Sequence, residues 1–187
     1  MDSPFMNQIA ALLAERDIRV LRFEFAYMAA RRNGGKRRPA PKAETLTEAY
    51  RATVAAAAEG GAGRLAIGGK SMGGRVASLV AGELCGTGVI GGLVCLGYPF
   101  HPPAMPEKLR TAHLEGLACP SLIVQGERDP FGARAEVEGY RLPATMQLAW
   151  MGDGDHDFGP RGASGFTRKG NLAAAADAVA QFLAGLR

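Results

Sequence analysis

The chain has 187 residues, 47% of them hydrophobic and 21% charged, which is typical of a folded globular protein and excludes a disordered or disulfide-stapled one. Its length is that of one domain, so we expect a single domain over residues 1–187. The net charge of +4 is too small to indicate a nucleic-acid partner by itself.

The first predicted helix begins at Ser3 and Pro4, a capping residue followed by proline at the first helical position. A strand is expected at residues 18–25, IRVLRFEF, and an irregular segment with glycines and prolines at residues 27–42. Residues 45–48, TLTE, match a capping box, which predicts the start of a second helix.

Strand and helix then alternate to the end of the chain. Short apolar strands are expected at RLAIGG (64–69), VIGGLVCLG (89–97), SLIVQG (121–126) and TMQLAWM (145–151), the last near a sheet edge. Helices are expected after Ser71, at residues 133–140 and at the C-terminus. Apolar strands separated by amphipathic helices predict a three-layer α/β/α sandwich with a mostly parallel sheet of about five strands.

A glycine-rich motif follows the strand at residues 64–69. Residues 69–73, Gly-Lys-Ser-Met-Gly, match G-x-S-x-G. In a nucleophile elbow this pattern places the serine, here Ser71, on a sharp strand-to-helix turn. Gly69 and Gly73 would leave space for that turn, and the helix N-terminus favours developing negative charge. A glycine-rich turn that binds phosphate or has no catalytic role is the alternative.

A serine nucleophile needs a base, and the base needs an orienting acid, in the chain order serine, acid, histidine. Of the three histidines, only His156 follows the last predicted strand, in a polar, glycine-rich loop. Asp129 is the candidate acid because the strand at residues 121–126 exits into a loop there, and Glu127 is the fallback. The alternatives are a surface turn for His156 and a helix cap for Asp129.

Other features are less specific. Lys70, Tyr98 and His101 are candidates for the rim of a small substrate pocket, although packing explains them equally well. The basic stretch at residues 31–42 fits either a solvated loop or an attraction for an anionic partner. No dinucleotide fingerprint, Walker loop or aromatic-interleaved basic patch is present, so we expect a small-molecule substrate, no cofactor and no nucleic-acid partner.

Localisation rests on cysteine usage and on apolar runs. The three cysteines show no metal-ligand spacing, and we interpret them as reduced thiols, with no metal expected. Neither a signal peptide nor an uninterrupted apolar run of about 18 residues is visible, so we expect a cytoplasmic protein without a membrane partner.

Four ordered segments carry a family resemblance. GGKSMGGR, LGYPFHPP, GERDPFG and GDHDFGPR resemble the α/β-hydrolase superfamily, more narrowly its dienelactone-hydrolase-like branch of bacterial predicted hydrolases. A vertebrate testis-expressed protein and a subunit of a chromatin acetyltransferase complex are similar to that branch. The resemblance covers residues 3–185. It implies that Ser71 is the nucleophile, Asp129 the acid and His156 the base, and that the Met72 N–H supports the oxyanion.

The sequence departs from that branch at its start. Members usually have a strand and a His-Gly-x-Gly-type loop before a segment like MDSPFM, with which this sequence begins. That loop supplies a second oxyanion donor, and losing one such donor costs about 10²–10³ in rate. Without the strand, residues 18–25 would pair with the elbow strand, accept a partner chain or stay unpaired. Two functions follow: a serine hydrolase of small esters, lactones or thioesters, or a non-catalytic interaction module with a vestigial triad.

Overall fold

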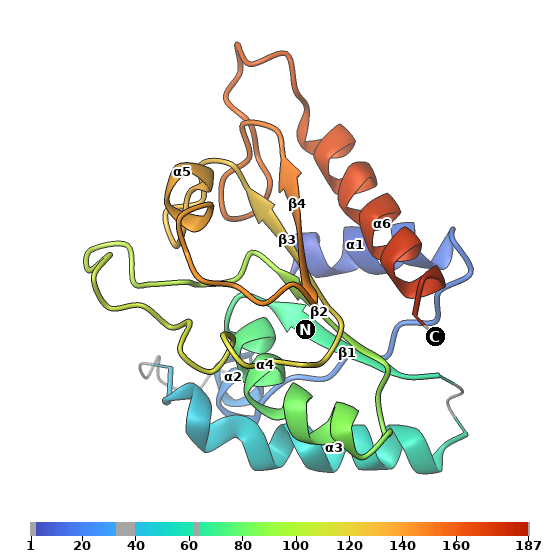
Figure 1. Cartoon of the computed structure of the whole chain (residues 1–187). Helices are drawn as coiled ribbons and strands as arrows, with labels where there is room; N and C mark the ends of the chain where they lie inside the picture. The colour runs from blue at the N-terminus through green and yellow to red at the C-terminus, as the bar shows by residue number, and fades with distance from the viewer. Residues whose placement is uncertain (1–2, 33–39, 62–63, 187) are drawn as a thin grey trace.

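The computed structural model describes residues 3–32, 40–61 and 64–186 (Figure 1). Its elements are α1 (Pro4–Ala14), α2 (Ala26–Arg32), the 3₁₀-helix η1 (Ala43–Leu46), α3 (Thr47–Glu59), β1 (Ala66–Lys70), α4 (Met72–Gly86), β2 (Gly92–Leu96), β3 (Ser121–Gly126), α5 (Arg134–Val137), β4 (Met146–Met151) and α6 (Arg168–Ala184). No helix in these ranges is long and apolar enough to cross a bilayer.

The sheet has four parallel strands in the order β1-β2-β3-β4. β3 is buried along its whole length, as expected for a largely apolar run inside a parallel sheet, and β4 lies at the edge. Because the strands are parallel, the C-terminal ends of all four lie side by side along one border of the sheet, which we call its C-terminal edge. The connection from β2 to β3, residues 97–120, contains turns and no helix.

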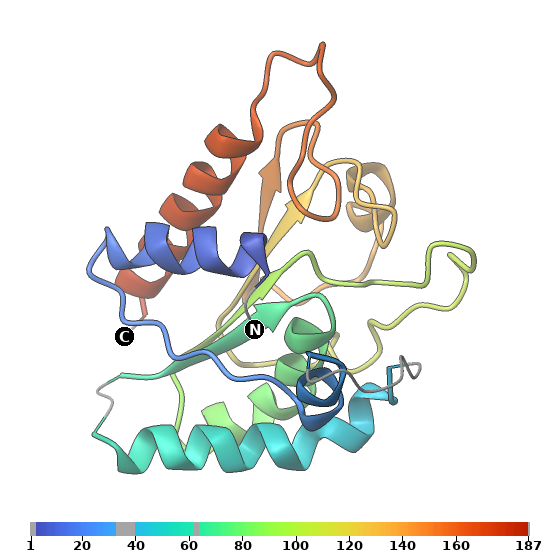
Figure 2. The ribbon, with the colours of Figure 1, turned by 180° about the vertical axis from the view of Figure 1, so that it is seen from behind.

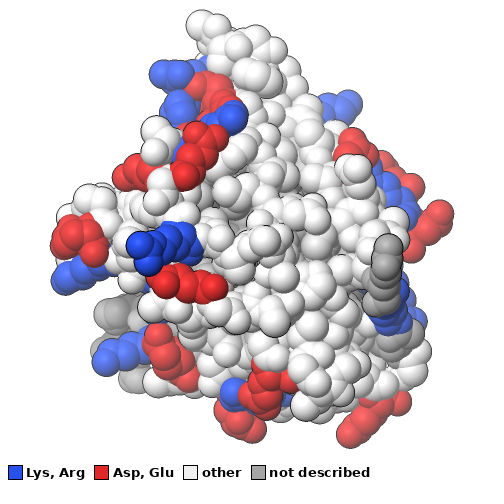
Figure 3. Space-filling model, viewed as in Figure 1, with Lys and Arg blue, Asp and Glu red and all other residues white. Residues whose placement is uncertain are grey.

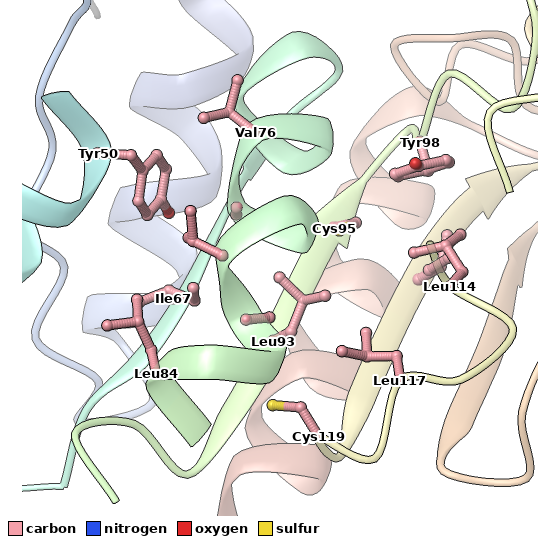
Figure 4. Packing of buried hydrophobic residues seen from close by; sticks show 14 of the residues in the cluster. Tyr50, Ile67, Val76, Leu84, Leu93, Cys95, Tyr98, Leu114, Leu117 and Cys119 are labelled. Atoms are coloured by element: carbon pink, nitrogen blue, oxygen red, sulfur yellow. The ribbon is translucent and has the colours of Figure 1, made fainter. Parts of the chain in front are cut away.

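Two apolar layers sandwich the sheet. α1 and α6 pack on one face, and η1, α3 and α4 cover the other (Figures 1 and 2). Alternate residues of each strand face opposite layers: Leu93 and Cys95 belong to the α4 side, shown in Figure 4, and Leu122 and Val124 belong to the α6 side. The predicted α/β/α sandwich is thus confirmed, with four strands in the described residues.

The prediction of a strand at residues 18–25 is wrong. This segment runs extended beside β1 without pairing to it (Figure 2). Phe25 is buried, whereas Leu21 is 66% exposed. The outer edge of β1 is already occupied, since the Tyr50 hydroxyl donates to the Gly68 carbonyl at 2.6 Å and accepts from the Gly68 N–H at 3.0 Å. A buried side chain thus takes the place of a neighbouring strand at that position.

Local capping signals had mixed outcomes. The Ser3 hydroxyl accepts the Met6 N–H at 3.3 Å, which confirms the predicted start of α1. The prediction of a capping box at residues 45–48 is wrong. The Thr45 hydroxyl donates to the Lys42 carbonyl, and the 3₁₀-helix η1 precedes α3. α2 also occupies the first part of the segment at 27–42 that the glycines and prolines marked as irregular.

Tyr50→Phe is expected to lower the free energy of unfolding by about 1–3 kcal/mol, because the N–H and C=O of Gly68 lose their buried partner. Chemical denaturation measures the change. Tyr140→Phe is the matched control, since within the described residues the Tyr140 hydroxyl makes no hydrogen bond. An equal loss in both variants would contradict the role assigned to the Tyr50 hydroxyl.

Candidate active site

The predicted site residues gather at the C-terminal edge of the sheet. Ser71 follows β1 directly, Asp129 follows β3, and His156 lies in the loop after β4. The Ser71 N–H donates to the Leu96 carbonyl at 3.0 Å, which ties the turn at Ser71 to the end of β2. Three segments far apart in the sequence are therefore brought to one place by parallel pairing.

Ser71 occupies a strained turn. Its backbone has φ 52° and ψ −114°, a conformation that residues with a Cβ rarely adopt, and α4 begins at the next residue. A Cβ on Gly69 would stand 2.5 Å from the Gly73 carbonyl carbon, and one on Gly74 would stand 2.8 Å from the Gly69 oxygen. A Cβ on Gly73 would meet nothing within 4 Å. The close approach thus requires Gly69 and Gly74, and the prediction that it requires Gly73 is wrong.

Asp129 and His156 form a hydrogen-bonded pair. Nδ1 of His156 lies 2.8 Å from Oδ2 of Asp129, whose side chain is fully buried. The Gln125 amide donates to the same oxygen at 3.1 Å, and the Phe131 N–H donates to Oδ1 at 2.9 Å. Because an ionised carboxylate only accepts, we assign the His156 proton to Nδ1, which leaves Nε2 as the basic nitrogen.

Two residues that support this pair had not been identified from the sequence. Gln125 is a buried amide within an otherwise apolar strand, and it also accepts the Tyr98 N–H at 2.7 Å. Gly97 has φ +62°, and a Cβ there would stand 3.2 Å from Nδ1 of His156. A lone amide inside an apolar run and a glycine just after a strand were the available signals.

Ser71 and His156 border the same strand end without a direct bond. Ser71 is tied to Leu96, and His156 lies against the next residue, Gly97. Within the described residues, no hydrogen bond joins the Ser71 hydroxyl to His156. Such contacts are often long before substrate binds. The structure thus joins Asp129 and His156 directly and brings Ser71 to the same end of the sheet.

The Met72 N–H is the first backbone N–H of α4. α4 begins at Met72, and the first N–H groups of a helix have no acceptor within the helix. Their dipoles favour negative charge next to Ser71.

The rim prediction is wrong for Tyr98 and His101. Both are buried; the Tyr98 hydroxyl donates to the Arg110 carbonyl at 2.9 Å, and Nδ1 of His101 lies 3.0 Å from the Pro102 carbonyl oxygen. The Lys70 ammonium is engaged by Asp157 at 3.1 Å. Most of the basic stretch at residues 31–42 lies outside the described residues.

A groove of about 780 Å³ lies between the sheet and the C-terminal part of α6. It is lined by Gly91 and Pro120, which precede β2 and β3, so it opens at the other end of the sheet from Ser71. The groove therefore does not serve a substrate at Ser71. On the face of the molecule seen in Figure 3, charged side chains gather mainly at the periphery.

Glu127 does not orient His156. One of its oxygens accepts the Asp153 N–H at 2.9 Å, and the other pairs with Arg134 at 2.9 Å. It anchors the loop that carries His156, which excludes the fallback assignment as acid in this conformation. Asp153 in turn pairs with Arg161 and Arg128.

The Asp153 carboxylate stabilises the loop that carries His156, and this stabilisation depends on pH. Hydrogen bonds from Arg161 lower its pKa from 3.8 to about 2. A carboxylate whose pKa is lower in the folded state than in the unfolded state stabilises the fold at pH values above the unfolded-state pKa. This stabilisation is lost as the pH falls toward the folded-state pKa.

The difference in unfolding free energy between the wild-type protein and Asp153→Asn should therefore be largest above about pH 4 and shrink toward about pH 2. Denaturation at stepped pH measures it, with Asp177→Asn, a surface partner of Arg16, as the control. A difference that stays constant with pH would contradict the assignment.

Comparison with known proteins agrees with the observed fold. A family model described as an alpha/beta hydrolase domain matches residues 1–184. An alpha-beta serine hydrolase homologue from Coxiella burnetii has a TM-score of 0.66 at 16% identity, covering 98% of this chain and 77% of its own. A putative hydrolase of the alpha/beta superfamily from Xanthomonas campestris pv. campestris has a TM-score of 0.67 at 21% identity, covering 99% of this chain and 92% of its own. The esterase domain of a Rhodothermus marinus protein has a TM-score of 0.67 at 13% identity, covering 95% of this chain and 78% of its own.

At these identities the solved structures show a shared fold. The family model confirms the resemblance to the superfamily seen in the four sequence segments. The family match extends over almost the whole length, so the chain belongs to the alpha/beta hydrolase domain family.

Proposed function

We propose that this protein is a serine hydrolase of the dienelactone-hydrolase-like kind, which cleaves a small ester, lactone or thioester through an acyl-enzyme on Ser71. The observation that carries the proposal is the 2.8 Å bond between Asp129 and His156 at the sheet edge where Ser71 sits in its strained turn. Family membership and the serine-hydrolase and esterase neighbours support hydrolase chemistry.

In the proposed reaction, Nε2 of His156 takes the Ser71 hydroxyl proton as the oxygen attacks the substrate carbonyl carbon. The Met72 N–H and the α4 N-terminus stabilise the oxyanion. The intermediate collapses, the imidazolium gives its proton to the departing alcohol or thiol, and an acyl-serine remains. His156 then deprotonates a water that attacks the acyl carbon, which releases the carboxylic acid and restores Ser71.

A fluorophosphonate probe and a p-nitrophenyl ester test the proposal together. Labelling should map to Ser71 by mass spectrometry, and nitrophenol should be released in a burst that matches the amount of protein. Heat-unfolded protein is the control, because the strained turn and the Asp129–His156 pair exist only in the fold. Absence of both signals in folded protein would favour the non-catalytic interaction module.

The cellular setting is part of the same proposal. The thiols of Cys85, Cys95 and Cys119 are free, and Cys95 and Cys119 are buried. Free thiols are usual in a reducing compartment, so we place the protein in the cytoplasm, acting on a small-molecule substrate.

A further inference from the structure

Lys70 is an unusual residue for its position. It is the last residue of β1, next to Ser71, and its side chain is only 14% exposed. Burial lowers the pKa of the Lys70 ammonium, with Asp157 opposing the shift. A largely buried cation needs a close partner, and here that partner is the Asp157 carboxylate at 3.1 Å, whose own side chain is 59% exposed.

The ammonium lies beside the proposed base. A Cβ on Gly97 would stand 3.1 Å from Nζ of Lys70 and 3.2 Å from Nδ1 of His156, so both nitrogens border the same glycine. Nζ also lies 5.2 Å from the centre of the Phe5 ring. That ring packs edge-on against Phe158, which belongs to the same loop as His156. The side chain of Lys70 is thus enclosed between α1 and that loop.

Other contacts hold the His156 loop from a different side. Arg128 and Glu127, from the segment after β3, bind Asp153 and thereby fix the loop relative to the Asp129 segment. Among the described residues, the Lys70–Asp157 pair is the only ion pair or side-chain hydrogen bond that links this loop to β1. Asp157 directly follows His156, so the pair acts one residue from the imidazole.

We propose that Lys70 is a positioning residue, which holds His156 over Ser71 by tying the His156 loop to the nucleophile strand through Asp157. This inference rests on the proposed hydrolase function. It also gives a different role to the residue predicted at the substrate rim, because an ammonium paired with Asp157 is not available to a substrate anion.

A four-variant cycle of Lys70→Met, Asp157→Asn, the double variant and Lys70→Arg tests the pair. A misplaced base costs up to about 10²-fold in rate, so each single variant should lower kcat by about 10–10²-fold with KM unchanged. The double variant should be no slower than either single one, because both break one contact. Lys70→Arg should recover most of the rate, and Lys169→Met, an exposed lysine at the start of α6, should leave it unchanged.

If Lys70→Met and Asp157→Asn change kcat in opposite directions, the net charge near His156 sets the rate. That result would overturn the positioning role of Lys70. Unchanged kcat in Lys70→Met, beside an active wild-type protein, would overturn the inference and leave the proposed function intact.

Amide hydrogen exchange of residues 152–159 provides a readout that needs no activity. Lys70→Met and Asp157→Asn should each speed exchange in this loop, and Lys169→Met should not. If the wild-type protein hydrolyses nothing, the proposed function fails, while the exchange rates still decide whether Lys70 anchors the loop. Exchange as slow as in the wild-type protein would refute the anchor.

Discussion

Ser71→Ala is expected to lower kcat on an activated ester by about 10⁶-fold, because the variant lacks the oxygen that forms the acyl-enzyme. The Met72 N–H and the α4 N-terminus remain, and they support only a slow attack by water. Nitrophenol release and loss of fluorophosphonate labelling measure the effect.

The fold should survive this change. Alanine has the same Cβ at φ 52°, so the strain of the turn is unaltered, and no described hydrogen bond depends on the Ser71 hydroxyl. Thermal unfolding should therefore match that of the wild-type protein. Ser164→Ala is the matched control, since that hydroxyl donates to the Arg161 carbonyl near the His156 loop without touching Ser71. Substantial activity left in Ser71→Ala would assign the nucleophile elsewhere and overturn the mechanism.

The sequence predicted the residues whose chemistry depends on type and order. Ser71 follows a strand within a glycine motif, and β3 was predicted with its observed bounds because a largely apolar run suits the interior of a parallel sheet. Order along the chain then selected His156, and the hydrogen bond to Asp129 agrees with that choice.

What the sequence could not predict depends on which segments become neighbours. Residues 18–25 alternate like a half-buried strand, but pairing needs a free edge, and Tyr50 occupies that of β1 at Gly68. Gln125 and Gly97 matter only because parallel pairing brings them to Asp129 and His156. Local sequence patterns do not show which segments will become neighbours. The structure of residues 18–25 and the roles of Gln125 and Gly97 therefore depend on tertiary contacts.

Asp129→Asn is expected to lower kcat by about 10⁴-fold, because an amide lacks the charge that stabilises the imidazolium and cannot satisfy the donors that surround the carboxylate. Oδ2 receives the Gln125 amide and faces Nδ1 of His156, while Oδ1 receives the Phe131 N–H. If the amide nitrogen takes the Oδ1 position, it meets the Phe131 N–H as a second donor. If it takes the Oδ2 position, it opposes Gln125 and forces the His156 proton onto Nε2, which then cannot accept the proton of Ser71.

Either orientation leaves one donor facing another inside the fold, so Asp129→Asn should also unfold more easily than the wild-type protein. The catalytic loss should nevertheless persist well below the melting temperature of the variant, where the chain is fully folded. Glu127→Gln is the discriminating control, since Glu127 binds the Asp153 N–H and Arg134 and makes no described bond to His156. A rate loss in Glu127→Gln as large as that in Asp129→Asn would mean that the loop contacts of Glu127, rather than the acid beneath the imidazole, set the competence of the base.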